Sequence, residues 1–236
     1  MCAFERSEKG MEFKMKKKGN VFFNIIIIIS IIAILSIIGY VLYYYISNYM
    51  AVKEAEEAVQ EFENNIMVIA LDEEPKKEEQ VEEPNVEEES EQPQTNTQAS
   101  RSTTYYRNYE MIGTIQIPAT RVKAPIVDKV TPSSISAAVG FLYGPGLNEV
   151  GNTVLAAHNY RNGTFFSNNK NLVEGDVIYI TDSYGRKIEY TIYRTYTTTA
   201  EDFSYATRNT DGKREISLST CTTDVNKRLV IWAVES

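Results

Sequence analysis

Hydrophobic and polar residues divide the chain into segments of very different character. Residues 21–46 form an almost unbroken apolar run with no charged side chain. Residues 72–104 contain no aromatic side chain and are rich in Glu, Pro, Gln, Ser and Thr. From residue 105 to residue 236, short apolar stretches alternate with polar turns. The pattern predicts an N-terminal tail (1–20), a transmembrane helix (21–46), a stalk and linker (47–104) and one folded domain (105–236).

The apolar run is long enough to cross a bilayer, because about 20 apolar residues span its hydrocarbon core. The run is longer than the apolar core of a signal peptide, about 7–15 residues, and no small-x-small cleavage site follows it, so we expect an uncleaved anchor. Four lysines lie between residues 14 and 18, whereas the residues after the run are acidic. The positive flank of a membrane helix faces the cytoplasm. We therefore expect a single-pass protein of the cell membrane, with residues 1–20 in the cytoplasm and the folded domain outside.

The segment between the membrane helix and the folded domain changes character along its length. Residues 51–71 place Ala51, Ala55, Ala58 and Phe62 near one helical face, which predicts a stalk that continues the membrane helix. The acidic, proline-containing stretch that follows cannot bury enough apolar surface to offset chain entropy, so we expect it to be disordered and extended. We expect this linker to act as a spacer that holds the domain off the membrane.

The pattern of the folded domain is mainly β, and its length is sufficient for one core. The expected strands are 111–117, 122–127, 153–157, 177–181, 187–196, 215–220 and 229–234. Residues 182–186 form a turn signal that joins two of these strands into a hairpin. Only 133–138 and 168–173 have the pattern of short helices. Seven or eight short strands with long loops favour a closed or nearly closed barrel.

Composition excludes several classes of site. The net charge is −8, yet residues 51–100 hold three basic against sixteen acidic side chains, so the acidity belongs to the linker. The folded domain is not basic enough to suggest nucleic acid. Two Cys and one His exclude a disulfide framework, a multi-Cys zinc site and a site built on two imidazoles. Glu201 and Asp202 are too few carboxylates for a calcium site and suit a solvated loop. We expect no metal and no cofactor.

Three residues at predicted strand ends could carry chemistry. His158 directly follows the run 153–157, Cys221 ends a strand, and Arg228 begins the last one. A lone His is more often structural than catalytic. An unpaired thiol outside the cytoplasm is uncommon, and Cys2 lies on the other side of the membrane, so Cys221 is either buried or reactive. Together the three side chains could supply a nucleophile, proton transfer and an oxyanion donor.

The residues at these positions resemble the sortase family, the membrane-anchored cysteine transpeptidases of Gram-positive bacteria. SLSTC at 217–221 is similar to the TLxTC signature, with Ser217 in place of the first Thr. KRLVI at 227–231 resembles the family's Arg at the start of the last strand, and GNTVLAAH at 151–158 resembles its GN-x-V-L-x-G-H segment. IGTIQIP at 112–118 and APIV at 124–127 are similar to its opening strands. The likeness runs over about 110–234, in the family's order.

The resemblance implies an eight-stranded sortase-type β-barrel and a cell-wall transpeptidase. It implies that Cys221 attacks the Thr–Gly bond of an LPXTG-like sorting signal in a secreted protein and forms a thioester. His158 would protonate the leaving amine and deprotonate the incoming one, which comes from a peptidoglycan precursor or another acceptor. Arg228 would stabilise the oxyanion, and the Thr220 hydroxyl would help to shape the substrate groove. The loop 197–213 is expected to set signal specificity.

The subclass and two alternative functions stay open at this point. HNYRNGTFF at 158–166 resembles the segment after the His in class B, whereas the 63 positions from His158 to Cys221 are similar to class A or D. One alternative is another Cys–His peptidase of the cell wall. An L,D-transpeptidase would need Gly where Thr220 stands, and a papain-like or NlpC-type enzyme would place Cys before His. The other alternative is a non-catalytic extracellular binding domain on a stalk, with Cys221 buried.

Overall fold

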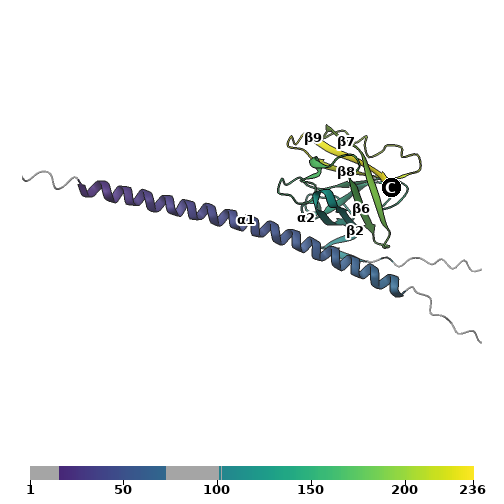
Figure 1. Cartoon of the computed structure of the whole chain (residues 1–236), viewed down its shortest axis with the longest axis horizontal. Coiled ribbons are helices and arrows are strands. Elements are labelled where there is room, and N and C mark those ends of the chain that lie inside the picture. Colours follow the sequence, from purple (N-terminus) through teal and green to yellow (C-terminus); the bar gives the residue numbers. More distant parts are fainter. Residues whose placement is uncertain (1–15, 73–100, 102) are drawn as a thin grey trace, which may run out of the picture. The chain divides into compact units, whose positions relative to one another are not determined.

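The computed structural model describes residues 16–72, 101 and 103–236, which belong to two compact units divided between Ala51 and Val52. A long helix, α1 (Lys16–Asp72), contributes to both units, and a β-barrel follows it in the chain (Figure 1). The other elements are β1 (Thr104–Tyr106), β2 (Tyr109–Ile117), the 3-10 helix η1 (Pro118–Thr120), β3 (Val122–Val127), α2 (Ser134–Ala137), β4 (Val139–Tyr143), β5 (Gly151–Ala156), the 3-10 helix η2 (Asn169–Asn171), β6 (Val177–Asp182), β7 (Lys187–Thr199), β8 (Arg214–Cys221) and β9 (Lys227–Glu235). Most of the stretch at 72–104, expected to be disordered, lies outside the described residues, although Asp72 ends α1 and Thr104 begins β1.

Residues 21–46 of α1 are apolar on all sides. This helix is the one among the described residues that is long and apolar enough to cross a membrane, and none of its most apolar window is buried. Such a surface suits lipid rather than water. The Ser36 hydroxyl donates a hydrogen bond to the Ile32 carbonyl one turn earlier, at 2.8 Å, which satisfies this polar group within the helix. The predicted membrane segment is therefore helical and consistent with a membrane anchor.

The last part of α1 belongs to the same unit as the barrel and packs with it. Ala55, Val59 and Phe62 are buried, at a spacing that places them on one helical face. The cluster that includes Ala55 and Phe62 also contains Tyr106, Met111, Val127, Ala137 and Ala138. Two ion pairs join the same surfaces, Arg107 with Glu54 and Lys123 with Glu63. The helical stalk is thus in contact with the β domain over several turns.

Eight strands close the barrel in the order β2-β3-β4-β5-β8-β9-β7-β6, and β6 pairs back onto β2. The short β1 pairs with the start of β2, at Tyr109–Met111, before the part of β2 that pairs with β6. The barrel core consists of inward-facing side chains, including Ile115, Ile126, Leu155, Ile180, Ile216, Leu218 and Ile231. The prediction of a mainly β, eight-stranded barrel is confirmed.

Closure of the barrel needs a glycine in β2. Gly113 pairs with Ile126 on one side and with Asp182 on the other, next to a break in the β2–β3 register. A Cβ at this position would lie 2.4 Å from the Thr181 carbonyl oxygen. A larger residue would therefore push β6 away from β2, where the sheet closes.

The strands agree closely with those expected from the sequence, with two omissions, the three-residue β1 and β4. No strand was expected at β4, which follows α2 directly and has Gly140 at its second position. β4 pairs with β3 over only two residue pairs. The hairpin around 182–186 and the two short helical segments lie where the pattern predicts them.

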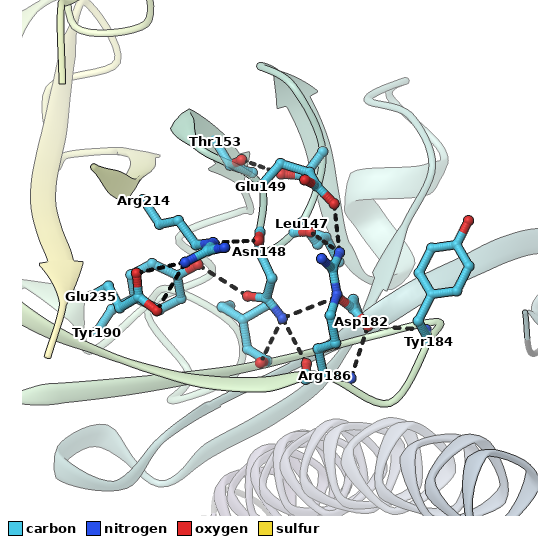
Figure 2. Close-up of polar contacts among 12 residues, drawn as sticks. Leu147, Asn148, Glu149, Thr153, Asp182, Tyr184, Arg186, Tyr190, Arg214 and Glu235 are labelled. Carbon is cyan, nitrogen blue, oxygen red and sulfur yellow. Dashed lines mark hydrogen bonds and ion pairs between the residues drawn. The ribbon is translucent and has the colours of Figure 1, made fainter. Parts of the chain in front are cut away.

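A buried polar network ties the β4–β5 loop to the β6–β7 hairpin (Figure 2). The Asn148 side-chain nitrogen lies 2.7 Å from the Arg186 carbonyl oxygen and 3.2 Å from that of Ile180. The Tyr190 hydroxyl donates to the Asn148 side-chain oxygen at 3.0 Å. Asn148 is 1% exposed, so its amide is satisfied by protein groups. Arg186 also binds Asp182 in the hairpin turn, at 2.7 Å.

We expect Asn148→Ala to lower the free energy of unfolding by about 3 kcal/mol, because it leaves several buried partners without a hydrogen bond. Urea unfolding of the full chain in detergent micelles measures the change. Asn171→Ala, at the exposed end of η2, is the matched control and should change stability by less than about 0.5 kcal/mol. A loss at Asn148 no larger than that of the control would contradict the structural role of the network.

Candidate active site

The three predicted site residues lie at the ends of three neighbouring strands. β8 is the middle strand, with β5 parallel on one side and β9 antiparallel on the other. Every β5–β8 pair joins residues 63 positions apart, from Gly151 with Arg214 to Ala156 with Ser219. His158 and Cys221 are also 63 positions apart, so the same register, continued by two residues, sets them opposite each other.

Arg228 lies on the other side of β8, so that His158, Cys221 and Arg228 form a row across the three strand ends. It is the direct partner of Cys221 in the β8–β9 ladder. Neighbouring strands lie about 4.8 Å apart. The backbones that carry the thiol, the imidazole and the guanidinium are therefore adjacent, although the residues come from three separate parts of the sequence.

Strand alternation puts the row on the outer face of the barrel. Ile216 and Leu218 of β8 belong to the core, whereas Ser217 and Ser219 face outward and bind Asn152 and the Tyr205 hydroxyl. Side chains two residues apart share a face of a strand. Cys221 is therefore on the outward face together with the two serines.

The same alternation applies to the other two strands. Leu155 and Ala157 point into the core and Val154 points outward, so His158 follows on the outward side. In β9, Ile231 is inward and Val230 is outward, which puts Arg228 outward as well. The three side chains share one face and one end of the sheet.

The thiol of Cys221 is free and half-buried. It lies where β8 ends and the loop 222–226 to β9 begins. A hydrogen bond from the Thr222 N–H to the Lys227 carbonyl, at 3.2 Å, closes this loop. A thiol in this position can be reached from solvent. The site therefore lacks the buried, inert sulfur that the binding-domain alternative requires.

The His158 imidazole is half-buried beside an aromatic ring. The centroid of the Tyr160 ring is 4.9 Å from that of the imidazole. Burial removes water from the ring and lowers the pKa of His158 below 6.5. The imidazole is therefore neutral at neutral pH and can accept a proton.

The Arg228 guanidinium is held by the turn that precedes it. Its Nη1 donates to the Val225 carbonyl at 2.9 Å and to the Lys227 carbonyl at 3.3 Å. Nε and Nη2 form no hydrogen bond with any residue in the described part of the chain. The guanidinium is thus anchored through one nitrogen and keeps donors for another group.

Thr220 lies on the opposite face from its neighbour Cys221. It is 4% exposed, and its hydroxyl donates to the Ala157 carbonyl at 2.7 Å. This bond joins the end of β5 to the end of β8 from inside the barrel. Thr220 therefore holds together the two backbones that carry His158 and Cys221.

Sequence reasoning missed the residues that fix the loops around this row. Asn152 donates to the carbonyls of Tyr205 and Ala206, at 2.9 and 3.0 Å, and so holds the loop between β7 and β8. Asn159, directly after the histidine, donates to the Cys221 carbonyl at 3.0 Å. Asn152 lies within the GNTVLAAH segment that carries the family resemblance, whereas the polar side chain of Asn159 is the only signal that the sequence offers there.

Comparison with known proteins agrees with this architecture. The family model of the sortase domain matches residues 115–236, which is more than half of the chain. This chain belongs to the sortase family. The sequence resemblance is thereby confirmed. A search of curated proteins finds no match to the chain.

Several solved sortases are similar in structure. Sortase A from Corynebacterium diphtheriae is 27% identical, with a TM-score of 0.50, and the match covers 54% of this chain and 61% of that one. This chain therefore spans less than two thirds of that protein. Sortase A from Listeria monocytogenes is 24% identical, with a TM-score of 0.50, and the match covers 53% of this chain and 87% of that one. Sortase C-1 from Actinomyces oris is 27% identical, with a TM-score of 0.48, and the match covers 52% of this chain and 72% of that one. The subclass stays open.

We expect the His158 imidazole to titrate below pH 6.5, because the folded domain shields it from water. Its Hε1 proton signal in NMR measures this directly, since the chain has one histidine. Tyr160→Ala should expose the ring and move the pKa up towards 6.5. Because the unfolded chain binds this proton more readily, the contribution of His158 to stability should fall as the pH drops below about 6.5. A folded-state pKa at or above 6.5 would show that the ring is not shielded.

Proposed function

We propose that this sortase cleaves an LPXTG-like sorting signal of secreted proteins and transfers the cleaved protein to a cell-wall amine. The adjacency of Cys221 to Arg228 in one ladder, with His158 in the same register, is the observation that supports the proposal most strongly. A half-buried free thiol at a strand end, paired across the ladder with an arginine, suits a nucleophile. A domain that only binds a partner has no need of this arrangement.

The first half-reaction is acylation of the thiol. The Cys221 thiol gives its proton to the neutral His158 imidazole as its sulfur attacks the threonine carbonyl carbon of the signal, and the carbonyl oxygen takes up negative charge. The C–N bond to the glycine then breaks. The protonated His158 imidazole donates its proton to the leaving amine, and a thioester joins Cys221 to the secreted protein.

The second half-reaction releases the enzyme. An amine of a peptidoglycan precursor, or another acceptor amine, attacks the thioester carbon. Neutral His158 takes the proton from this amine, the C–S bond breaks, and the sulfur leaves as the thiol or thiolate. Burial lowers the pKa of His158 and so favours the neutral imidazole, which is the form that can take a proton at this step.

Arg228 and Thr220 have different roles in the proposal. The nitrogens of Arg228 that are not bound to the turn donate to the oxyanion and to substrate carbonyls. Thr220 shapes the groove from below, because its hydroxyl bond to the Ala157 carbonyl holds the strand ends together.

The proposed location follows from the chemistry and from the charges around α1. Sorting signals and peptidoglycan amines meet outside the membrane. The lysines at 14–18 favour a cytoplasmic N-terminus. The catalytic domain then faces the cell wall, and the anchor keeps it near secreted substrates.

We expect Cys221→Ala to abolish cleavage of LPXTG-type peptides while leaving the thermal midpoint within a few degrees of the parent. The change removes the nucleophile and only one half-buried atom. A fluorescence-quenched peptide assay with the full chain in micelles, with and without an added amine, measures cleavage. Mass spectrometry should detect a thioester on Cys221 of the parent chain.

Arg228→Lys is the companion variant, since it keeps the charge and loses the planar fork of donors. It should retain the thioester but lower kcat/KM by about 100-fold, as loss of an oxyanion donor does. Full activity of Cys221→Ala would refute the nucleophile. Near-parental activity of Arg228→Lys would leave Arg228 with a role limited to the turn.

A further inference from the structure

Side-chain hydrogen bonds continue the pairing of β5 with β8 after the backbone ladder stops. The last backbone bond of this pair runs from the Ala157 N–H to the Ser219 carbonyl, at 3.3 Å. In a parallel ladder that continued, the next donor would be the N–H of residue 159 and the next acceptor the Cys221 carbonyl. The structure keeps this acceptor but changes the donor.

The Asn159 side chain takes the place of its own backbone N–H. Its Nδ2 donates to the Cys221 carbonyl at 3.0 Å. The backbone is then free to leave the strand, and residues after Ala156 are no longer part of β5. The register is preserved for two more residues without a continuous strand.

The other end of the same amide shapes the loop. The Asn159 Oδ1 accepts the Arg161 N–H at 3.2 Å, and Arg161 adopts a left-handed conformation with φ of 58°. The Arg161 guanidinium in turn donates to the Thr223 carbonyl at 3.2 Å. Asn159 is thus bonded to both the loop that carries the histidine and the strand that carries the cysteine.

We propose that Asn159 is a positioning residue that holds His158 in register with Cys221 by standing in for a missing backbone donor. The inference rests on the proposed function. In that function, His158 exchanges a proton with an amine that leaves or attacks the carbon bound to Cys221, so the imidazole must be held at a fixed distance from this carbon. Asn159 touches the Cys221 backbone rather than the sulfur, so it acts through the placement of the other two residues. A displacement of about 1 Å in such a site can cost about 100-fold in rate.

Thr220 does not make Asn159 redundant. The Thr220 hydroxyl binds the carbonyl of Ala157, one residue before the histidine and on the inner face. Asn159 is the residue after the histidine, and its side chain binds the Cys221 carbonyl. The two bonds bracket His158, and the loss of either leaves one side of it free to move.

The test compares Asn159→Asp and Asn159→Ala with Asn162→Asp in the full chain in micelles. Asn159→Asp is isosteric and keeps the acceptor for Arg161, but it loses the donor to Cys221. Asn162→Asp adds the same charge to the same loop and keeps the oxygen that accepts from the Thr164 N–H at 3.0 Å. We expect both Asn159 variants to lower kcat for peptide cleavage by at least tenfold, with KM within threefold and the thermal midpoint within a few degrees.

An activity-independent readout separates this inference from the proposed function. In Asn159→Ala, which adds no charge, the NMR pKa of His158 should move up towards 6.5 as the released loop exposes the ring. If the parent chain cleaves no peptide, the proposed function fails and this NMR shift alone decides the positioning role.

Three results would overturn the inference. The first is kcat within twofold of the parent together with an unchanged His158 pKa. The second is an equal loss of kcat in Asn162→Asp, which would mean that charge is the cause. The third is a fall in the thermal midpoint large enough to account for the lost activity, which would make Asn159 a stabilising residue only.

Discussion

The parallel pairing of β5 with β8 is the constraint on which the site depends. A slip of one residue in this ladder would turn every side chain of one strand to the other face. His158 would then point into the core, away from Cys221. Core packing of Leu155 against Ile216 and Leu218 on the inner face opposes such a slip, and so does the bond between Ser217 and Asn152 on the outer face.

The polar side chains on the outer face of β8 are held in place by hydrogen bonds. Ser217 and Ser219 are buried under the loop between β7 and β8, and each has a hydrogen-bond partner. A buried hydroxyl without a partner would cost stability. The row that carries Cys221 lies beyond this covered region, at the rim. The barrel therefore supplies a rigid base, and the reactive groups stand where substrate can reach them.

The sequence was sufficient for most of the fold, because the strands that form the barrel alternate or carry short apolar runs. β4 escaped notice, since a five-residue strand that pairs with β3 over two residues leaves little pattern. The stalk helix was expected, but its packing onto the β domain was not. Contacts between residues such as Phe62 and Met111 join distant positions that no local pattern links.

In the candidate site, too, some residues could be predicted from the sequence and others could not. His158, Cys221 and Arg228 stood out because each combines a reactive group with a strand end, and a family resemblance connected them. The interval of 63 positions was visible in the sequence, but it becomes a register only when β5 and β8 are parallel neighbours. Asn148 and Asn159 could not be found, because an asparagine in a loop looks the same whether it binds water or a carbonyl 62 residues away.

A disulfide test addresses the shared row most directly. In a Cys2→Ser background, His158→Cys should form a disulfide with Cys221 under mild oxidation, because Cα atoms on neighbouring strands lie within the 4.4–6.8 Å that a disulfide spans. Ala157→Cys, one residue earlier and facing the core, should remain reduced under the same conditions. Peptide mapping by mass spectrometry identifies the bond. Efficient cross-linking of His158→Cys alone is the predicted result, and cross-linking of Ala157→Cys instead would contradict the register.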